Sequence, residues 1–174
     1  MWVFAYGSLM WRPDFAYAEG TPARLFGWHR AMCILSTHWR GTPERPGLVL
    51  GLDRGGSCLG RAFRVAAAEA EAVRSALHAR EMISGVYEPR FLPVRLADGS
   101  CVPAWSFVVV RAHAQHWRGG EDEAARLVCQ GSGLAGSSRD YLANTVMHLD
   151  ALGIREGALH RLLRRVESLT PAPP

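Results

Sequence analysis

The sequence predicts an α+β fold, an antiparallel or mixed β-barrel with α-helices on its outside and at its ends. Two observations lead to this prediction. Short apolar runs separated by turn residues dominate the first two-thirds of the chain, and segments with helical spacing gather in the last third. The chain has 174 residues, 48% apolar and 21% charged, which fits one globular domain that needs no disulfide or metal to hold its core. We therefore expect a single domain over residues 1–170 and a frayed, Pro-rich tail at 171–174.

The expected strands are apolar runs bounded by turn residues, and they cover residues 2–6, 24–35, 48–52, 59–65, 91–96 and 101–110. The third and fourth are expected to be joined by a turn at Asp53-Arg54-Gly55-Gly56. The last two flank Ala97-Asp98-Gly99-Ser100, and the Asp-Gly pair in this connection is a strong signal for a β-hairpin.

The expected helices have apolar residues at helical spacing, and they cover residues 66–82, 122–129, 139–152 and 157–169. The third has the clearest ends. Ser137 or Ser138 can cap it, Asp140 lies in its first turn, where a carboxylate is favourable, and Gly153 ends it.

Composition excludes several classes of function. All 20 basic residues are Arg, so a Walker A phosphate loop and a catalytic lysine are absent. The net charge of +4 is mild and the arginines are scattered, which does not indicate nucleic-acid binding. No apolar window is long enough for a membrane-spanning helix, and the first residues resemble a strand and not a signal peptide. The four cysteines form no CxxC motif and are expected to be reduced thiols of a cytoplasmic protein.

Two patterns resemble cofactor or metal motifs and are interpreted otherwise. The run Gly131-Ser-Gly-Leu-Ala-Gly136 matches G-x-G-x-x-G. A dinucleotide site needs a strand before it and a second βα unit after it, whereas here a helical segment precedes it. We expect a loop that leads into a helix N-terminus. His113 and His116 have the spacing of two metal ligands, but no third ligand follows at a characteristic spacing, so no metal site is expected.

Three segments have features of a binding or catalytic site, and each has a structural alternative. The first strand runs into Gly7-Ser8, where successive N–H groups can form an anion-binding nest; the alternative is an ordinary strand end. Glu81 ends a helix among apolar neighbours, where partial burial would raise the pKa of its carboxyl group. Alternatively it faces solvent and pairs with Arg80 or Arg90. The loop at 38–46, rich in Arg and Pro, is either the wall of a site or a plain surface loop.

Glu88 is a competing carboxylate, but it precedes Pro89 and is expected at a loop or at the start of a strand.

At this point the residues show a family resemblance. Tyr6-Gly7-Ser8-Leu9 resembles the hallmark of the γ-glutamylcyclotransferase-like superfamily, and the longer run 4–13 resembles its ChaC branch, which cleaves glutathione. Residues 40–47 and 133–142 resemble two further ChaC segments. Arg80-Glu81, followed by Gly85 and Tyr87, is similar to the segment that holds the catalytic glutamate of that family. One departure is the link 82–86, which replaces a shorter Lys- and Gly-containing link of eukaryotic members.

The resemblance implies a reaction without cofactor or metal, in which the α-amine of a γ-glutamyl group attacks its own side-chain amide. Glu81 would be catalytic, moving the proton from the amine to the leaving nitrogen. The implied substrate-binding residues are Tyr6, Gly7, Ser8, Leu9, Arg40, Tyr87 and Tyr141. The N–H groups of 7–9 would hold a carboxylate or an oxyanion, Tyr6 would shape the floor of the pocket, and Tyr141 would donate its hydroxyl to the γ-glutamyl group. Arg40 or Arg45 would pair with the glycine carboxylate of glutathione.

The expected partner is therefore a small molecule, with no nucleic acid and no membrane, bound by a monomer. Two alternatives stay open at this point. One is the same chemistry on other γ-glutamyl amines or peptides, and the other is a non-catalytic binding module that keeps the barrel. Tyr6-Gly7-Ser8-Leu9 together with Glu81 speaks against the binding module, because a pure binder does not need a desolvated carboxylate.

Overall fold

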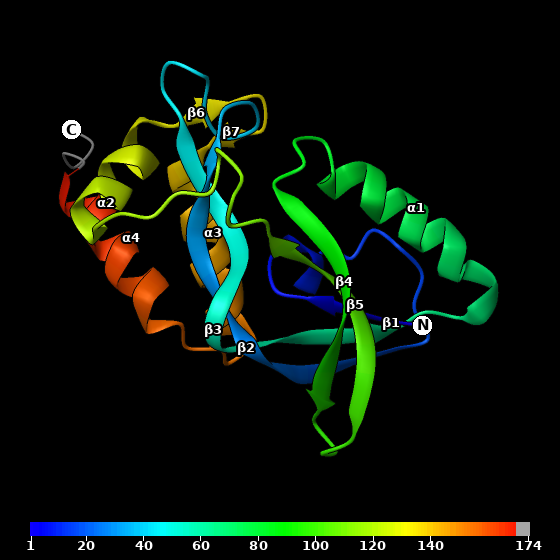
Figure 1. The fold of residues 1–174 in the computed structure, drawn as a ribbon. Helices are drawn as coiled ribbons and strands as arrows, with labels where there is room; N and C mark the ends of the chain where they lie inside the picture. Colours follow the sequence, from blue (N-terminus) through cyan, green and yellow to red (C-terminus); the bar gives the residue numbers. More distant parts are fainter. Residues whose placement is uncertain (170–174) are drawn as a thin grey trace. The chain divides into compact units, whose positions relative to one another are not determined.

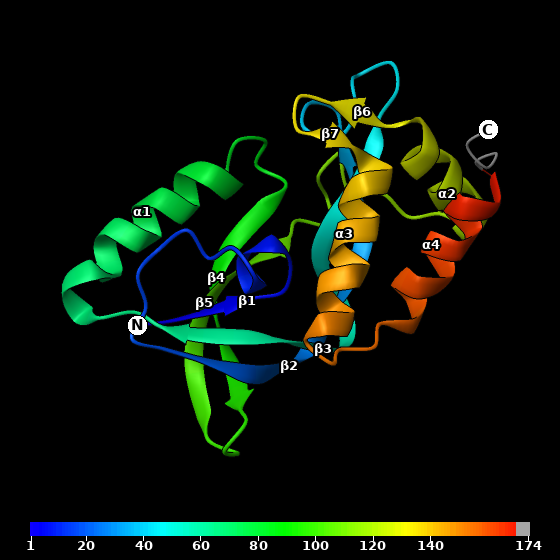
Figure 2. The same ribbon diagram turned by 180° about the vertical axis from the view of Figure 1, so that it is seen from behind.

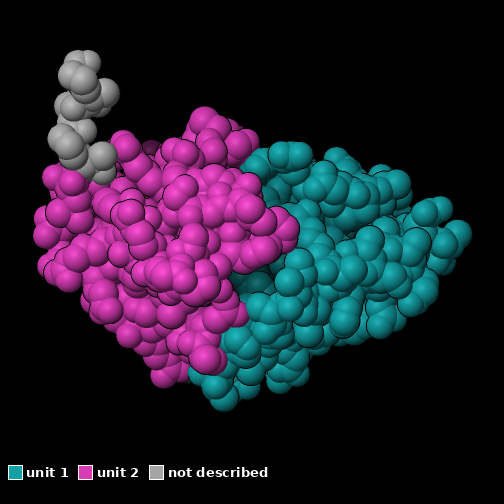
Figure 3. Space-filling view, turned by 90° about the horizontal axis from the view of Figure 1, so that it is seen from above, with its two compact units in different colours: residues 1–30, 52–113 teal, residues 31–51, 114–174 magenta. Residues whose placement is uncertain are grey.

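The computed structural model describes residues 1–169, and Figures 1 and 2 show its ribbon from opposite sides. The predicted tail at 171–174 lies outside the described residues. The chain divides into two compact units, coloured separately in Figure 3. Unit 1 contains Met1–Arg30 and Leu52–His113, and unit 2 contains Ala31–Gly51 and, of the described residues, 114–169. The single-domain assignment of residues 1–170 stays a prediction.

Five strands form a closed barrel in the order β1-β3-β2-β4-β5. Their bounds are β1 Trp2–Ala5, β2 Glu19–Ser36, β3 Gly47–Arg64, β4 Tyr87–Leu96 and β5 Cys101–Val109. The short β1 closes the barrel, because it pairs antiparallel with β3 and parallel with β5. This one parallel pairing makes the barrel mixed, and the predicted fold class is confirmed.

The predicted turn at residues 53–56 is wrong, because β3 passes through these residues without reversing. Gly55 and Gly56 both have positive φ, +105° and +64°, a region that glycine enters without steric cost. The strand therefore bends at the glycine pair and continues. The Gly55 carbonyl oxygen lies 3.1 Å from Nδ1 of His29 in β2.

The β4–β5 hairpin is confirmed, with Leu96 and Cys101 at the ends of its strands. Gly99 has a φ of +87°, and the Asp98 carboxylate accepts hydrogen bonds from the N–H and the hydroxyl of Ser100, at 2.9 and 2.7 Å. These are the features that make Asp-Gly a turn signal.

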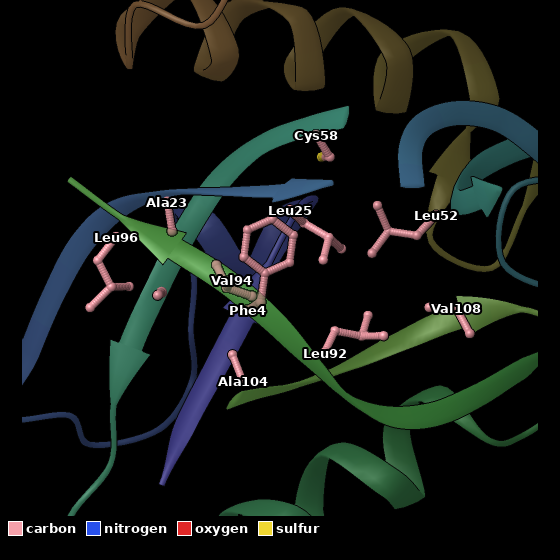
Figure 4. Packing of buried hydrophobic residues seen from close by; sticks show 11 residues of the cluster. Phe4, Ala23, Leu25, Leu52, Cys58, Leu92, Val94, Leu96, Ala104 and Val108 are labelled. Carbon is pink, nitrogen blue, oxygen red and sulfur yellow. The ribbon is translucent and has the colours of Figure 1, made fainter. Parts of the chain in front are cut away.

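The barrel interior holds the main apolar cluster of unit 1, which Figure 4 shows from close by. Phe4 of β1 lies in this cluster and is 1% exposed, with Leu25, Leu52 and Val94 fully buried around it. Truncating a buried Phe to Ala costs about 3–5 kcal/mol. Burial of Phe4 therefore fixes β1, and with it the turn that follows.

A second apolar cluster, the helix-side cluster, packs α1 against the barrel. Its buried members come from β1, α1, β5 and the residue that follows β3, and they are Val3, Val65, Val73, Leu77, Trp105 and Phe107. The helix α1 covers Ala70–Glu81 and follows a 3₁₀ turn at Ala67–Glu69. The predicted helix at 66–82 is thus confirmed in its main part, with a tighter first turn.

Unit 2 contains three mutually packed helices, α2 Glu121–Gln130, α3 Ser138–Ala151 and α4 Gly157–Leu169. Between α2 and α3 lies a small hairpin of β6 Ser132–Gly133 and β7 Gly136–Ser137. The predicted cap is confirmed, since the Ser137 hydroxyl oxygen accepts a hydrogen bond from the Asp140 N–H at 2.9 Å. None of the helices in the described residues has the length and apolar character needed to cross a membrane.

Candidate active site

The segment after β1 folds into a 3₁₀ turn at Ser8–Met10. The Met10 N–H donates to the Gly7 carbonyl oxygen at 2.9 Å, and the Arg12 N–H donates to that of Ser8 at 2.8 Å. The Met10 N–H is the first donor of the turn. The N–H groups of Ser8 and Leu9 come before it in the chain, so they have no acceptor within the turn itself.

Two arginines of the barrel hold this segment in place. Arg30 is 3% exposed, and its guanidinium donates to the carbonyl oxygens of Tyr6 and Leu59. Arg61 donates to the Met10 carbonyl oxygen at 3.2 Å. Both ends of the segment 6–10 are therefore fixed by charge-assisted hydrogen bonds. Neither arginine was predicted from the sequence to have a role. The signal for Arg30 was an arginine inside a long apolar run.

Glu81 is the last residue of α1, and its side chain is 23% exposed. Met82, the next residue, packs against the helix-side cluster, and Val86, five residues further along the chain, is buried. Burial raises the pKa of the Glu81 carboxyl group above its ordinary value, and the Arg80 guanidinium partly opposes this rise. Nε of Arg80 lies 3.3 Å from Oε1 of Glu81. The two interpretations of this glutamate are thus both right in part, because it is shielded from water and also paired with Arg80.

Arg80 makes two further contacts, and they connect the end of α1 to the segment after β1. Its Nη2 donates to the Ser8 hydroxyl oxygen at 2.9 Å, and its Nη1 lies 3.1 Å from Oδ2 of Asp14. One guanidinium therefore joins Glu81 to Ser8. Asp14 was not singled out from the sequence.

The competing carboxylate is placed differently. Glu88 lies in β4 and is 47% exposed at its side chain, and it pairs with Arg90 at 2.9 Å. Arg90 is thereby engaged with Glu88, whereas Glu81 pairs with Arg80.

Other expected site residues of unit 1 lie near the same elements. Leu9 and Tyr87, the first residue of β4, pack against the helix-side cluster together with Met82. The Tyr6 side chain packs instead against the cluster inside the barrel. The structure therefore brings Ser8, Leu9, Glu81 and Tyr87 to the region where α1 ends.

In unit 2, Arg40 and Tyr141 lie together. The guanidinium carbon of Arg40 is 5.3 Å from the centre of the Tyr141 ring, a cation–π geometry. Nη1 of Arg40 also donates to the Ser137 carbonyl oxygen, at 3.4 Å. Arg45 is exposed and closes a local turn with Thr42. Of the two arginines expected near the substrate, Arg40 is the one beside the tyrosine.

The glycines of the G-x-G-x-x-G run serve close packing of two backbones. The N–H groups of Leu134 and Ala135 donate to the carbonyl oxygens of His38 and Trp39, at 3.0 and 2.8 Å. A Cβ at Gly131 would lie 2.3 Å from Cα of Gly47. Only glycine fits there, so the pattern has a structural reason, and the segment leads into α3 as expected.

No group of three or more His, Cys, Asp or Glu side chains within residues 1–169 is arranged to hold a metal ion. His116 forms an isolated antiparallel β-bridge with Ile34 of β2.

Comparison with known proteins places these features in a family. The model of the ChaC-like protein family matches residues 1–169. A glutathione-specific γ-glutamylcyclotransferase of Escherichia coli K12 is 36% identical over 170 residues, which are 97% of this chain and 74% of that protein. A γ-glutamylcyclotransferase of Arabidopsis thaliana is 28% identical, with coverage of 97% of this chain and 89% of that protein.

The fold has a close counterpart among solved structures. The crystal structure of a yeast γ-glutamylcyclotransferase specific to glutathione superposes with a TM-score of 0.87, at 22% identity, covering 97% of this chain and 96% of the other. The family match spans both units and contains every expected site residue. The chain therefore belongs to the ChaC-like family.

Proposed function

We propose that this protein is a γ-glutamylcyclotransferase that converts glutathione to 5-oxoproline and Cys-Gly. One structural observation carries the proposal. A carboxylate shielded from water, Glu81, is joined by Arg80 to Ser8 in the turn after β1. The names of the E. coli and Arabidopsis relatives support the reaction class, and the E. coli name supports the substrate.

The reaction is intramolecular and makes limited demands on the protein. The α-amino nitrogen of the γ-glutamyl group bonds to the side-chain carbonyl carbon, and the bond from that carbon to the cysteinyl nitrogen breaks. A five-membered lactam forms and no water is consumed. The protein has to hold the substrate in a folded conformer in which the nitrogen already faces the carbonyl, and such positioning can supply several kcal/mol of the barrier, of the order of 7–11 in favourable cases.

Glu81 is the group that moves the proton in this proposal. The α-ammonium must lose a proton before its nitrogen can attack, and the cysteinyl nitrogen must gain one to leave. A carboxylate accepts the first proton and returns one to the leaving nitrogen. The raised pKa of Glu81 suits this role, because it brings the proton affinity of the carboxylate closer to that of an amine.

The turn after β1 is proposed to hold negative charge. The N–H groups of Gly7, Ser8 and Leu9 would bind the α-carboxylate of the substrate or the oxyanion that develops on the carbonyl. Arg30 and Arg61 support this assignment, because they fix the carbonyl oxygens at both ends of the turn. Such preorganisation lets the donors act without moving during the reaction.

The remaining assignments concern side chains around the substrate. Tyr6 is proposed to shape the floor of the pocket, and Tyr87 to line it. In unit 2, Tyr141 is proposed to donate its hydroxyl to the γ-glutamyl group and Arg40 to pair with the glycine carboxylate. The cation–π contact between Arg40 and the Tyr141 ring supports their acting together.

The conditions of action follow from the chemistry. Proton transfer and positioning suffice for lactam formation, so we propose a reaction without cofactor or metal. We also propose that the protein is cytoplasmic, because glutathione and reduced thiols belong to that compartment. We further propose that it is a monomer. Light scattering on the purified protein checks the monomer, and a mass of twice the monomer would contradict it.

A substrate panel tests the proposed specificity. The purified protein is incubated without metal or nucleotide with glutathione and, separately, with several γ-glutamyl dipeptides, and 5-oxoproline is measured by mass spectrometry. We expect 5-oxoproline from glutathione, with an equal amount of Cys-Gly, and far less from the dipeptides. Efficient turnover of dipeptides with intact glutathione would contradict the specificity and keep the reaction class. Lactam from no substrate, with ligands still raising the melting temperature, would favour a binding module.

A further inference from the structure

We propose that Arg80 is a positioning residue, which holds the Glu81 carboxylate at a fixed place beside the turn after β1. The proposal rests on the proposed role of Glu81 as the group that moves the proton. It assigns to Arg80 a task distinct from substrate binding, carried out through Glu81.

All three nitrogens of the Arg80 guanidinium are engaged, each with a different partner. Nε lies 3.3 Å from Oε1 of Glu81, Nη1 lies 3.1 Å from Oδ2 of Asp14, and Nη2 donates to the Ser8 hydroxyl oxygen at 2.9 Å. A guanidinium is planar and rigid, so two hydrogen-bonded partners, Ser8 and Asp14, together with the ion pair to Glu81 restrict its orientation. Lysine has one rotatable charge and cannot reproduce this geometry.

The neighbouring positions of Arg80 and Glu81 do not by themselves produce this contact. Successive residues of a helix point in different directions, and side chains at i and i+1 do not face each other. The contact with Glu81 is also the longest of the three. Ser8 and Asp14 therefore anchor Arg80, and the anchored guanidinium in turn orients the carboxylate at the end of α1.

The backbone at Asp14 supports the network independently. Among the described residues other than glycine, Asp14 is the one with a positive φ, which is 55°. Asp enters this region more readily than most residues, but it is still disfavoured relative to glycine. Such an outlier persists where the surroundings hold it, and the contact from the Asp14 carboxylate to Arg80 is the interaction found there.

The charge of Arg80 also acts on the proton chemistry. Glu81 has to be ionised in order to accept a proton, and burial alone favours its neutral form. The adjacent guanidinium counteracts burial, so it lowers the pKa that burial has raised. Without Arg80, the Glu81 carboxylate would lose its orientation and would ionise only at higher pH.

The test compares R80Q and R80K with R74Q as the control. Arg74 lies on the same helix and is similarly exposed; it pairs loosely with Glu71, at 3.6 Å, lies over the Trp105 ring at 5.7 Å, and within residues 1–169 forms no hydrogen bond or ion pair with Glu81 or Ser8. The measured quantity is kcat/KM for glutathione as a function of pH, with thermal melting as a check on folding. We expect R80Q to lower kcat/KM at least about tenfold at neutral pH, the order of effect of a misplaced group, and to move the acid limb to higher pH.

R80K is expected to keep the acid limb near its original pH, since the positive charge remains. Its kcat/KM should stay reduced, because the ammonium group lacks the planar set of donors of a guanidinium. R74Q should leave both unchanged. An acid limb in R80Q that matches R74Q, with kcat/KM within about twofold of it, would overturn the proposal.

A second readout separates this proposal from the proposed function. In protein labelled with ¹³C at the glutamate carboxyl carbons, the signal of Glu81 is identified by its loss in E81Q, and its titration is followed without substrate. We expect the midpoint to move to higher pH in R80Q and to stay in R74Q. If the wild type forms no 5-oxoproline but this shift occurs, the function fails and the link from Arg80 to Glu81 stands. If no shift occurs, the link fails whatever the activity.

Discussion

Glu81 has two surroundings that act on its charge in opposite directions. Burial at the end of α1 raises the pKa of its carboxyl group, and the guanidinium of Arg80 lowers it. The rise is the larger effect, so the group titrates above its ordinary pKa. A carboxylate with a raised pKa binds a proton more tightly than a solvated glutamate does.

The pH dependence of turnover follows from this residue. In the proposed mechanism Glu81 accepts a proton and has to be ionised in the free enzyme, so kcat/KM should fall as the pH drops through its raised pKa, at a pH above the 4.5 of an unperturbed Glu. The measurement is the initial rate of 5-oxoproline formation across pH 4–9 at low substrate. An acid limb at or below the ordinary pKa of glutamate would contradict a shielded Glu81.

The raised pKa of Glu81 should also make the stability of the fold depend on pH. Since the pKa of Glu81 is raised in the folded state, ionising the group costs stability above that pKa, and the cost vanishes below the unfolded value, where both states are protonated. E81Q, which cannot ionise, should therefore melt at a higher temperature than the wild type at neutral pH and lose this advantage in acid. Melting followed by circular dichroism checks this. A lower melting temperature of E81Q at neutral pH would show that the pairing with Arg80 outweighs burial.

At the scale of elements, the contact of residues 38–47 with residues 131–135 depends on glycines. Gly131 lies with its Cα against the backbone of Gly47, where a side chain has no room. This contact places Arg40 next to Ser137 and, one turn into α3, next to Tyr141. Backbone packing thus holds Arg40 and Tyr141, the two residues of unit 2 proposed to contact the substrate.

G131A should destabilise the protein by roughly 1–3 kcal/mol, because the added Cβ would lie 2.3 Å from a backbone atom that cannot move away cheaply. G120A is the matched control. Gly120 also adjoins α2, but a Cβ there meets nothing within 4 Å and its φ of −78° suits any residue. Urea unfolding of both variants gives the difference. Equal stability of G131A and wild type would mean that the two loops separate without cost.

Most elements could be predicted from local pattern, and the exceptions have physical causes. The cap of α3 and the β4–β5 hairpin depend on residues within four positions of each other, so their signals are visible in the sequence. The Gly55-Gly56 pair was misread as a turn because positive φ permits both a reversal and a bend in a long strand. Only pairing with neighbouring strands decides between the two.

At the scale of the whole molecule, the expected site residues come from distant parts of the chain. The Ser8–Arg80 contact spans 72 positions, and the Arg40–Ser137 contact spans 97. The sequence indicated each segment through its resemblance to the ChaC branch. No local pattern predicts that Arg80 contacts Ser8 or that Arg30 donates to the Tyr6 carbonyl oxygen. Such pairs depend on closure of the barrel and on the packing of α1, which is why Arg30, Arg61 and Asp14 were not foreseen.

The measurement that tests the central claim most directly compares wild type, E81Q and E88Q on glutathione. 5-oxoproline and Cys-Gly are quantified together by mass spectrometry, with matched protein concentrations and confirmed folding. Glu88 is the control, since it is exposed and paired with Arg90. We expect equal amounts of both products from wild type and E88Q, and a loss of roughly 10²–10⁴-fold in E81Q, the contribution of one acid–base group. E81Q turning over at a rate close to that of E88Q would contradict the assignment of Glu81.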